Sequence, residues 1–262
     1  MDKTNYFIEG LQGAGKSTFL EKFSNKWKDY QVFREGDYSP VELAWCTYIT
    51  EEQYCEVLAR YAAIEAQIKE KTITENNHKI ICYTQILTDI PGFHKDLEGY
   101  EIYNGNLDKR AFEEVVFERF SRWNGAGQIF ECSIFQNIIE NQMLYLMLSE
   151  EEIFDFYRRL REILIDKQYK IIYLDVEDIA DAIHVIRKKR SDANGNEIWF
   201  PLMIQYLASS PYGKEHHLTN FDGLITHLAQ RKALEHRIIK EIFWENSVIL
   251  KAKNYSMDAI EP

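Results

Sequence analysis

The sequence predicts an α/β protein with a mainly parallel sheet and helices on both faces, in three layers. Short runs rich in β-branched and aromatic residues alternate with helical patterns along the 262 residues. The first of these runs ends in a glycine-rich turn that opens directly into a helix. No internal repeat and no Pro/Gly/Ser-rich linker divides the chain, so we expect a single domain over residues 1–262.

The elements before residue 124 follow from local patterns taken in order. Apolar runs predict strands, a capping box at Thr50 and Gln53 begins the longest helix of this half, and Asn104-Gly105 indicates a hairpin. The predicted elements are a strand at 6–9, a helix over 16–28, a strand at 31–35, a helix from 50 to about 71, a hairpin of 79–87 with 100–103, and a helix over 108–123.

The elements after residue 124 repeat the alternation of strand and helix. A second capping box, at Ser149 and Glu152, marks one helix start, and the C-terminal third is helical in period. The predicted elements are a strand at 128–131, a helix from 149 to about 166, a strand at 170–175, a helix over 179–190, helices up to about 245 and a last strand at 247–251.

The turn after the first strand carries the most specific signal. Residues 10–17 read Gly-Leu-Gln-Gly-Ala-Gly-Lys-Ser, which matches G-x-x-x-x-G-K-[ST]. Glycines let backbone N–H groups converge on an anion, and the helix start adds its positive dipole end. The motif predicts a P-loop NTPase-type sandwich that binds ATP or another nucleoside triphosphate with Mg²⁺. The residues expected to contact the nucleotide are Gly10, Gln12, Gly13, Ala14, Gly15, Lys16, Ser17 and Thr18.

Within this motif Lys16 is expected to reach the β- and γ-phosphates, and the Ser17 hydroxyl to ligate Mg²⁺. Three segments could supply a carboxylate that holds the ion through water: Glu131 and Asp175 each end an apolar run, and Asp89 lies in D-x-x-G. A GTPase would also need N-K-x-D, which the sequence lacks, so the switch interpretation of Asp89 is disfavoured.

Four segments, in order, resemble thymidylate kinases and deoxynucleoside kinases, within the P-loop nucleoside and nucleotide kinase group. Residues 7–18 (FIEGLQGAGKST) resemble the opening of these kinases, and 32–36 (VFREG) the second-strand T-R-E-P-G. Residues 131–133 (ECS) resemble E-R-S, and 173–176 (YLDV) with 186–190 (IRKKR) the stretch that opens the lid. The sequence departs from the pattern at Cys132, where the group has Arg, and in lacking Pro after Glu35.

The resemblance implies ATP- and Mg²⁺-dependent transfer of the γ-phosphoryl group to a small molecule, most of all a nucleoside or nucleotide. It implies a helical lid at about 178–200 and an inserted acceptor-site region at about 38–124. Glu131 is expected to hold Mg²⁺, and Arg187 and Arg190, three apart on one helix face, to act from the lid.

The acceptor site is expected beyond the second strand. Glu35 is the preferred base for the acceptor hydroxyl, Asp37 is the alternative, and Arg34 is the candidate for binding an acceptor anion. Arg34 and Glu35 reach one pocket only if the strand has already ended. Side chains that could stack on or hydrogen-bond a planar ring are Tyr38, Trp45, Tyr83, Gln85 and Tyr103.

The composition of the chain limits the classes of partner that it is expected to bind. The 31 basic and 42 acidic residues give a net charge of −11, which disfavours nonspecific nucleic-acid binding. No apolar run reaches membrane-spanning length, and the N-terminus lacks a signal-peptide pattern, so we expect a cytoplasmic protein without a membrane partner. The four cysteines are expected to be reduced, and a homodimer is compatible with the sequence.

Two alternatives to a nucleoside or nucleotide kinase stay open. Because Cys132 replaces an arginine that helps hold the acceptor in the resembling kinases, the acceptor could instead be the hydroxyl of a non-nucleoside metabolite or an antibiotic. A nucleotide-dependent switch or regulatory NTPase would use the same glycine motif without any acceptor.

Overall fold

The computed structural model describes residues 3–192 and 194–256. Its chain forms two compact units, residues 1–32 with 124–262 (unit 1) and residues 33–123 (unit 2). Unit 2 spans residues 33–123, and the inserted acceptor-site region that the resemblance implies spans about 38–124. Each unit has its own sheet and its own buried core.

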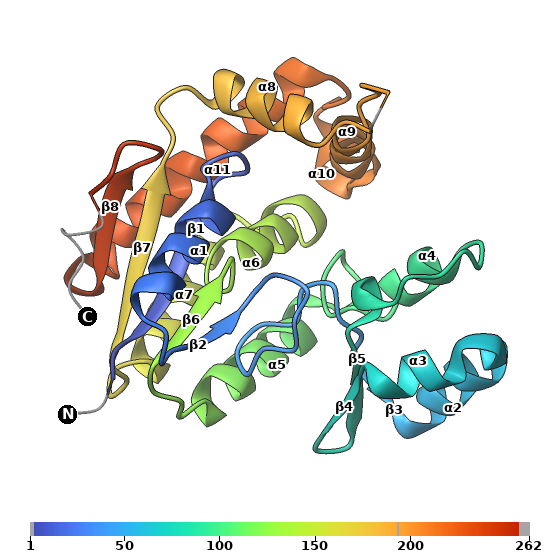
Figure 1. Ribbon diagram of the computed structural model, residues 1–262. Helices are drawn as coiled ribbons and strands as arrows, with labels where there is room; N and C mark the ends of the chain where they lie inside the picture. Colours follow the sequence, from blue (N-terminus) through green and yellow to red (C-terminus); the bar gives the residue numbers. More distant parts are fainter. Residues whose placement is uncertain (1–2, 193, 257–262) are drawn as a thin grey trace. The chain divides into compact units, whose positions relative to one another are not determined.

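Unit 1 is organised around a five-stranded sheet (Figure 1) with the strand order β2-β6-β1-β7-β8. The central strand β1 is parallel to both of its neighbours, and β7 is parallel to β8. The predicted α/β class with a mainly parallel sheet is therefore confirmed. The strands are β1 (Asn5–Gly10), β2 (Gln31–Phe33), β6 (Gln128–Glu131), β7 (Tyr169–Asp175) and β8 (Ser247–Lys251).

Helices cover both faces of this sheet. Successive side chains of a strand point to opposite sides, so each face presents its own set of side chains for a helix to pack against. On one face, Tyr6 and Ile8 share a core cluster with Phe19 of α1 (Lys16–Lys26). On the other, the ring of Tyr173 lies 5.1 Å from that of His236 in α11 (Phe221–Glu241). The helix α7 (Glu150–Ile163) lies beside α11 (Figure 1), and this layering is compatible with a three-layer sandwich.

The other helices of unit 1 follow β6 and β7. The predicted helix over 179–190 and the capping box at Ser149 are both present, whereas the helix and π-helical turn after β6 were not predicted. These segments are α6 (Gln136–Glu140), the π-helical turn η3 (Asn141–Tyr145), α8 (Ile179–Lys189), α9 (Trp199–Ser209), α10 (Pro211–Glu215) and the 3-10 turn η4 (Trp244–Asn246).

Unit 2 contains a three-stranded antiparallel sheet in the order β3-β5-β4 and a set of short helices. Its strands are β3 (Ile49–Thr50), β4 (Thr72–Glu75) and β5 (His78–Ile81), and its helical segments are α2 (Glu51–Arg60), η1 (Ala62–Ile64), α3 (Glu65–Glu70), η2 (Tyr83–Gln85), α4 (Phe93–Glu98) and α5 (Lys109–Arg122).

The predicted hairpin of 79–87 with 100–103 is wrong. The strand β5 ends at Ile81, and its hairpin partner is β4, joined through a turn in which Asn76 has a φ of 53°. The β4 sequence is short and leaves Ile73 36% exposed, so it has little of the apolar character that marks a buried strand. The helix predicted over 50–71 is interrupted at Tyr61, where φ is −112° and ψ is 37°.

The end of β2 bears on the acceptor prediction. The strand stops at Phe33, so Arg34 and Glu35 both lie beyond it, which is the condition under which the two side chains can reach one pocket.

No helix in the part of the chain that the structure describes is both long enough and apolar enough to cross a membrane.

Candidate functional site

The strand order of unit 1 creates a position suited to ligand binding at the carboxyl ends of β1 and β6. The chain leaves β1 through α1 toward β2, on the far side of β6, whereas it leaves β6 toward β7, on the other side of β1. In open α/β sheets ligands bind where neighbouring connections diverge in this way. The residues at this point are the loop 10–16, named here the glycine loop, and Glu131.

The glycine loop is tightly packed against two other elements. A Cβ on Gly10 would lie 2.6 Å from the carbonyl oxygen of Leu174 in β7, and one on Gly13 would lie 2.8 Å from that of Ala182 in α8. Both glycines also have positive φ, 137° and 82°. The loop can therefore follow this path only with glycine at these two positions.

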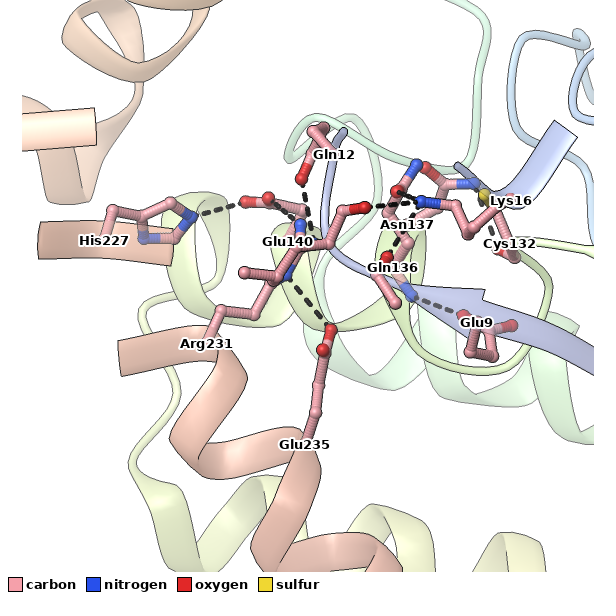
Figure 2. A network of polar contacts seen from close by, with 12 residues as sticks. Glu9, Gln12, Lys16, Cys132, Gln136, Asn137, Glu140, His227, Arg231 and Glu235 are labelled. Atoms are coloured by element: carbon pink, nitrogen blue, oxygen red, sulfur yellow. Dashed lines mark hydrogen bonds and ion pairs between the residues drawn. The ribbon is translucent and has the colours of Figure 1, made fainter. Parts of the chain in front are cut away.

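Lys16, the first residue of α1, folds back into the glycine loop (Figure 2). Its Nζ donates to the carbonyl oxygens of Gly10 and Leu11, at 2.8 and 3.0 Å, and to Oε1 of Gln136 at 2.9 Å. The residue is only 8% exposed, and among the described residues no carboxylate lies within ion-pair distance of the ammonium. A buried ammonium with only neutral acceptors is a site where an anion gains a strong charge-assisted interaction.

Ser17 and Glu131 form a second polar pair beside Lys16. The Ser17 hydroxyl donates to Oε1 of Glu131 at 2.6 Å, and Glu131 is 6% exposed at the end of β6. Register places Glu131 opposite Ile8, two residues before the glycine loop. A hydroxyl and a carboxylate in contact are the kind of oxygen ligands from which Mg²⁺ is held together with waters and phosphates.

Glu9 fixes the segment that presents Gln136 to Lys16. Its fully buried carboxylate accepts from the backbone N–H groups of Ile134, at 2.8 Å, and Gln136, at 3.4 Å. Burial raises the pKa of Glu9 to about 7, although the two N–H groups and Lys16 act in the opposite direction. Cys132, just before this segment, is 1% exposed with a φ of 60°, so it offers neither a charge nor an accessible donor in place of an arginine.

A buried polar network from α11 and α6 reaches the glycine loop on its other side (Figure 2). Arg231 bonds Glu140 through Nη1, donates from Nη2 to Oε1 of Gln12 at 2.9 Å, and pairs through Nε with Glu235 at 3.1 Å. His227 bonds the second Glu140 oxygen at 2.7 Å. Burial alone would raise the pKa of Glu140, but His227 and Arg231 lower it to about 2.

None of the sequence motifs predicts this network. Its helix members, His227, Arg231 and Glu235, recur every fourth residue and so share one face of α11. All three are at most 1% exposed. The only signal in the sequence is this stripe of charged residues at helical spacing. It does not identify a buried network, because an exposed stripe has the same sequence pattern.

The two predicted lid arginines lie at the C-terminal end of α8. Arg187 donates from Nε and Nη2 to the Glu197 carboxylate, at 2.9 and 3.0 Å, and its guanidinium lies 4.1 Å from the ring centroid of Phe200. Arg190 lies 5.7 Å from the ring of Trp199. The same helix touches the glycine loop near its start, at Ala182. Ala193 of the predicted lid lies outside the described residues.

Within unit 2, five of the predicted acceptor residues meet around Gly36. Asp37 accepts from the Arg34 backbone N–H and from Gln85 Nε2, both at 2.9 Å, and Gln85 also donates to the Gly36 carbonyl at 3.2 Å. Glu35 accepts from the Trp45 indole at 3.1 Å. Asp37 thus bonds the local backbone through Oδ2 and the Gln85 side chain through Oδ1.

The three predicted tyrosines of unit 2 each bond a carboxylate. Tyr38 donates to Glu75 at 2.7 Å, whereas Tyr83 and Tyr103, 2% and 5% exposed, bond the buried Glu101 and Glu42. Burial raises the pKa of Glu42 and of Glu101 to about 8 in each case, although the tyrosine hydroxyls act in the opposite direction.

These two carboxyls predict a stability that falls as pH rises. Their folded pKa is about 8 against an unfolded value of 4.5, so the folded protein holds their protons through this window and the unfolded chain does not. The free energy of unfolding should decrease from about pH 5 to pH 8. The Glu101→Gln variant, which keeps an acceptor for Tyr83, should flatten that slope in urea titrations at several pH values. The exposed Glu56→Gln should leave the slope unchanged, and an unchanged slope in both variants would contradict the assignment.

At one edge of the unit 1 sheet the structure thus brings together a buried ammonium, a hydroxyl–carboxylate pair and the start of α1. Over residues 3–192 and 194–256 no group of three or more His, Cys, Asp or Glu side chains is placed to hold a metal ion. A divalent ion at Ser17 and Glu131 would therefore complete its coordination with water and phosphate oxygens.

Comparison of the sequence with protein-family models and with curated proteins finds no match.

Proposed function

We propose that the protein is a P-loop kinase that transfers the γ-phosphoryl group of ATP to a small molecule, a nucleoside or a nucleotide. The observation that carries the proposal is the buried Lys16 ammonium, which has neutral acceptors only and lies at the N-terminus of α1 within the glycine loop. Backbone N–H groups, the helix dipole and the ammonium all favour an anionic phosphate chain there.

Magnesium fits the same proposal through Ser17 and Glu131. Their 2.6 Å contact supports a site in which the Ser17 hydroxyl would ligate the ion and Glu131 would hold it through water. When bound, the ion would neutralise charge on the phosphate oxygens during transfer.

The chemistry asks the protein for positioning and charge neutralisation more than for covalent steps. The bond between the γ-phosphorus and the β–γ bridging oxygen breaks, the acceptor oxygen bonds to the γ-phosphorus, and ADP leaves. Lys16 stabilises charge on the transferring group, and Glu35 takes the proton of an acceptor hydroxyl. We assign the lid to α8, and two features support this: Ala182, near the start of the helix, contacts the glycine loop, and Arg187 lies five residues, or about 7.5 Å, further along.

The Glu35→Gln variant tests the proposed base. Gln keeps the size and can still accept from Trp45, but it cannot take a proton, so kcat should fall about 10²-fold with unchanged affinity for ATP. A loose transition state needs little base assistance, which favours the lower end of the usual range.

Asp37→Asn is the matched comparison for Glu35→Gln. Asn offers one acceptor oxygen where Asp37 now accepts two bonds, so this variant is expected to weaken the loop around Gly36 and to raise KM. An active Glu35→Gln beside an Asp37→Asn variant that binds acceptor normally but does not turn over would assign the base to Asp37.

The lid arginines are tested by Arg187→Ala and Arg190→Ala. Each should lower kcat by about 10-fold or more while changing KM for ATP little, because such groups act on charge that develops in the transition state. Lys188→Ala, between them on α8, is the matched control. A raised KM with unchanged kcat in both arginine variants would indicate a static surface cluster instead.

The proposal as a whole is tested by a screen with γ-labelled ATP and Mg²⁺ against nucleosides, nucleotides, sugars and aminoglycosides. Transfer of label to a nucleoside or nucleotide is the expected result. Transfer only to a sugar or an aminoglycoside would show that the acceptor belongs to another class of molecule. The buried Cys132, which stands in place of an arginine, is compatible with that result. Hydrolysis that no acceptor stimulates would favour a regulatory NTPase and contradict the kinase.

A further inference from the structure

Two of the four cysteines lie in contact within unit 2. The Sγ atoms of Cys46 and Cys82 are 3.7 Å apart, and both residues are buried, at 0% and 4% exposure. They are free thiols in the structure, as is the exposed Cys55. A disulfide needs the sulfur atoms to approach to about 2.05 Å, so the separation must shorten by less than about 2 Å.

The backbone around this pair has the geometry a disulfide needs. The antiparallel register of β3 and β5 pairs Ile49 with Lys79 and Thr50 with His78, and it continues to place Cys46 opposite Cys82. The Thr47 N–H donates to the Ile81 carbonyl at 3.0 Å, which confirms the register one position before the cysteines.

The cysteines occupy a position without direct backbone bonds between them. The Cys82 N–H donates to Lys71, and the Cys46 N–H to Leu43. In antiparallel pairs, residues opposite each other at such a position have Cα atoms about 4.5 Å apart. A separation of that size lies within the range of about 4.4 to 6.8 Å that disulfides span.

We propose that Cys46 and Cys82 form a reversible disulfide in the folded protein when a hydroperoxide oxidises the pair. Cys82 is the first to react, because it is 4% exposed whereas Cys46 is fully buried. Its thiolate attacks a peroxide oxygen, the O–O bond breaks, and the leaving oxygen takes the proton that Cys82 lost. Cys46 then attacks the Cys82 sulfenic acid, the S–S bond forms, and water leaves with the Cys46 proton.

The disulfide has a consequence for the proposed acceptor loop, and this step rests on the proposed kinase function. In the reduced protein the Cys46 thiol lies 3.8 Å from the carbonyl oxygens of Gly36 and Asp37. Oxidation removes the only hydrogen that this thiol can donate to them. The segment that carries Glu35 and Asp37 is thereby loosened, and acceptor KM should rise in the oxidised protein.

The test uses the full chain carrying Cys55→Ser, because a tryptic peptide of residues 35–60 contains both Cys46 and Cys55. The native protein is treated with hydrogen peroxide, unfolded, and alkylated with N-ethylmaleimide. We expect three reactive thiols to fall to one, a cross-linked peptide joining 35–60 to 80–95, and full reversal by dithiothreitol. Cys46→Ala and Cys82→Ala, each added to this background, should abolish the cross-link.

Three accessible thiols after peroxide treatment, a link that involves Cys132, or irreversible oxidation of Cys82 without a cross-link would each overturn the proposal. The unmutated pair answers the question even where an alanine variant fails to fold. A cross-link in a protein that shows no kinase activity would leave the disulfide standing and remove only its predicted effect on acceptor binding.

Discussion

Replacing Lys16 by Ala is expected to slow phosphoryl transfer at least about 100-fold while leaving the protein folded. The ammonium donates three hydrogen bonds inside the glycine loop, at 2.8 to 3.0 Å, and has no carboxylate partner among the described residues. On the proposed function these donors turn to the transferring phosphate, and losing one such preorganised contact costs about 3 to 4 kcal/mol of transition-state stabilisation. The effect is measured as kcat with γ-labelled ATP.

Two variants control this experiment. Lys16→Met keeps the aliphatic stem that fills the loop, so it should be as inactive as Lys16→Ala even if the alanine variant is less stable. Lys28→Ala removes an exposed lysine just after α1 and should retain full activity. Retention of more than a tenth of the wild-type kcat by Lys16→Met, a loss below about 1.4 kcal/mol, would remove Lys16 from the reaction.

Replacing Arg231 by Met is expected to lower the free energy of unfolding by about 3 to 5 kcal/mol. The guanidinium is fully buried and is paired with Glu140 and Glu235. Removing one partner of a buried ion pair leaves the other charge uncompensated, and here two carboxylates would be stranded. Methionine approximates the volume, so the loss reports charge and hydrogen bonding more than an empty cavity. The quantity is measured by urea unfolding near neutral pH.

The same helix supplies the matched control. Arg237, six residues further along α11, pairs with Glu150 and Glu241, but its side chain is 50% exposed. Exposed ion pairs contribute at most about 1 kcal/mol, so Arg237→Ala should change stability little. Equal effects of the two substitutions would show that the network beside the glycine loop contributes no more than a surface pair.

The fold of unit 1 was predictable because its signals are local. The apolar runs of β1 and β7, the capping box at Ser149 and the glycine motif each depend on a few neighbouring residues, and the structure has the corresponding elements. Unit 2 was less predictable because its strands are two to four residues long. Such strands are defined by their partners, and a partner's register cannot be read from one segment.

The candidate site likewise contains contacts that the sequence predicts and contacts that it does not. The Lys16, Ser17 and Glu131 cluster could be expected from sequence, since the motif and a strand end place these residues at one edge of a parallel sheet. The bond from Arg231 to Gln12 could not, because it joins residues 219 positions apart. Likewise, nothing in the spacing of Tyr83 distinguishes a ring-stacking residue from the buried donor to Glu101 that the structure contains.

Binding of ATP with Mg²⁺, measured by isothermal titration calorimetry, tests the central claim most directly, because it needs no knowledge of the acceptor. We expect one saturable site per chain, with a dissociation constant within the usual range up to about 1 mM. ADP should compete for the site, EDTA should weaken the binding, and Lys16→Met should not bind. Absence of saturable binding to the wild-type protein, or equal binding to Lys16→Met, would contradict it.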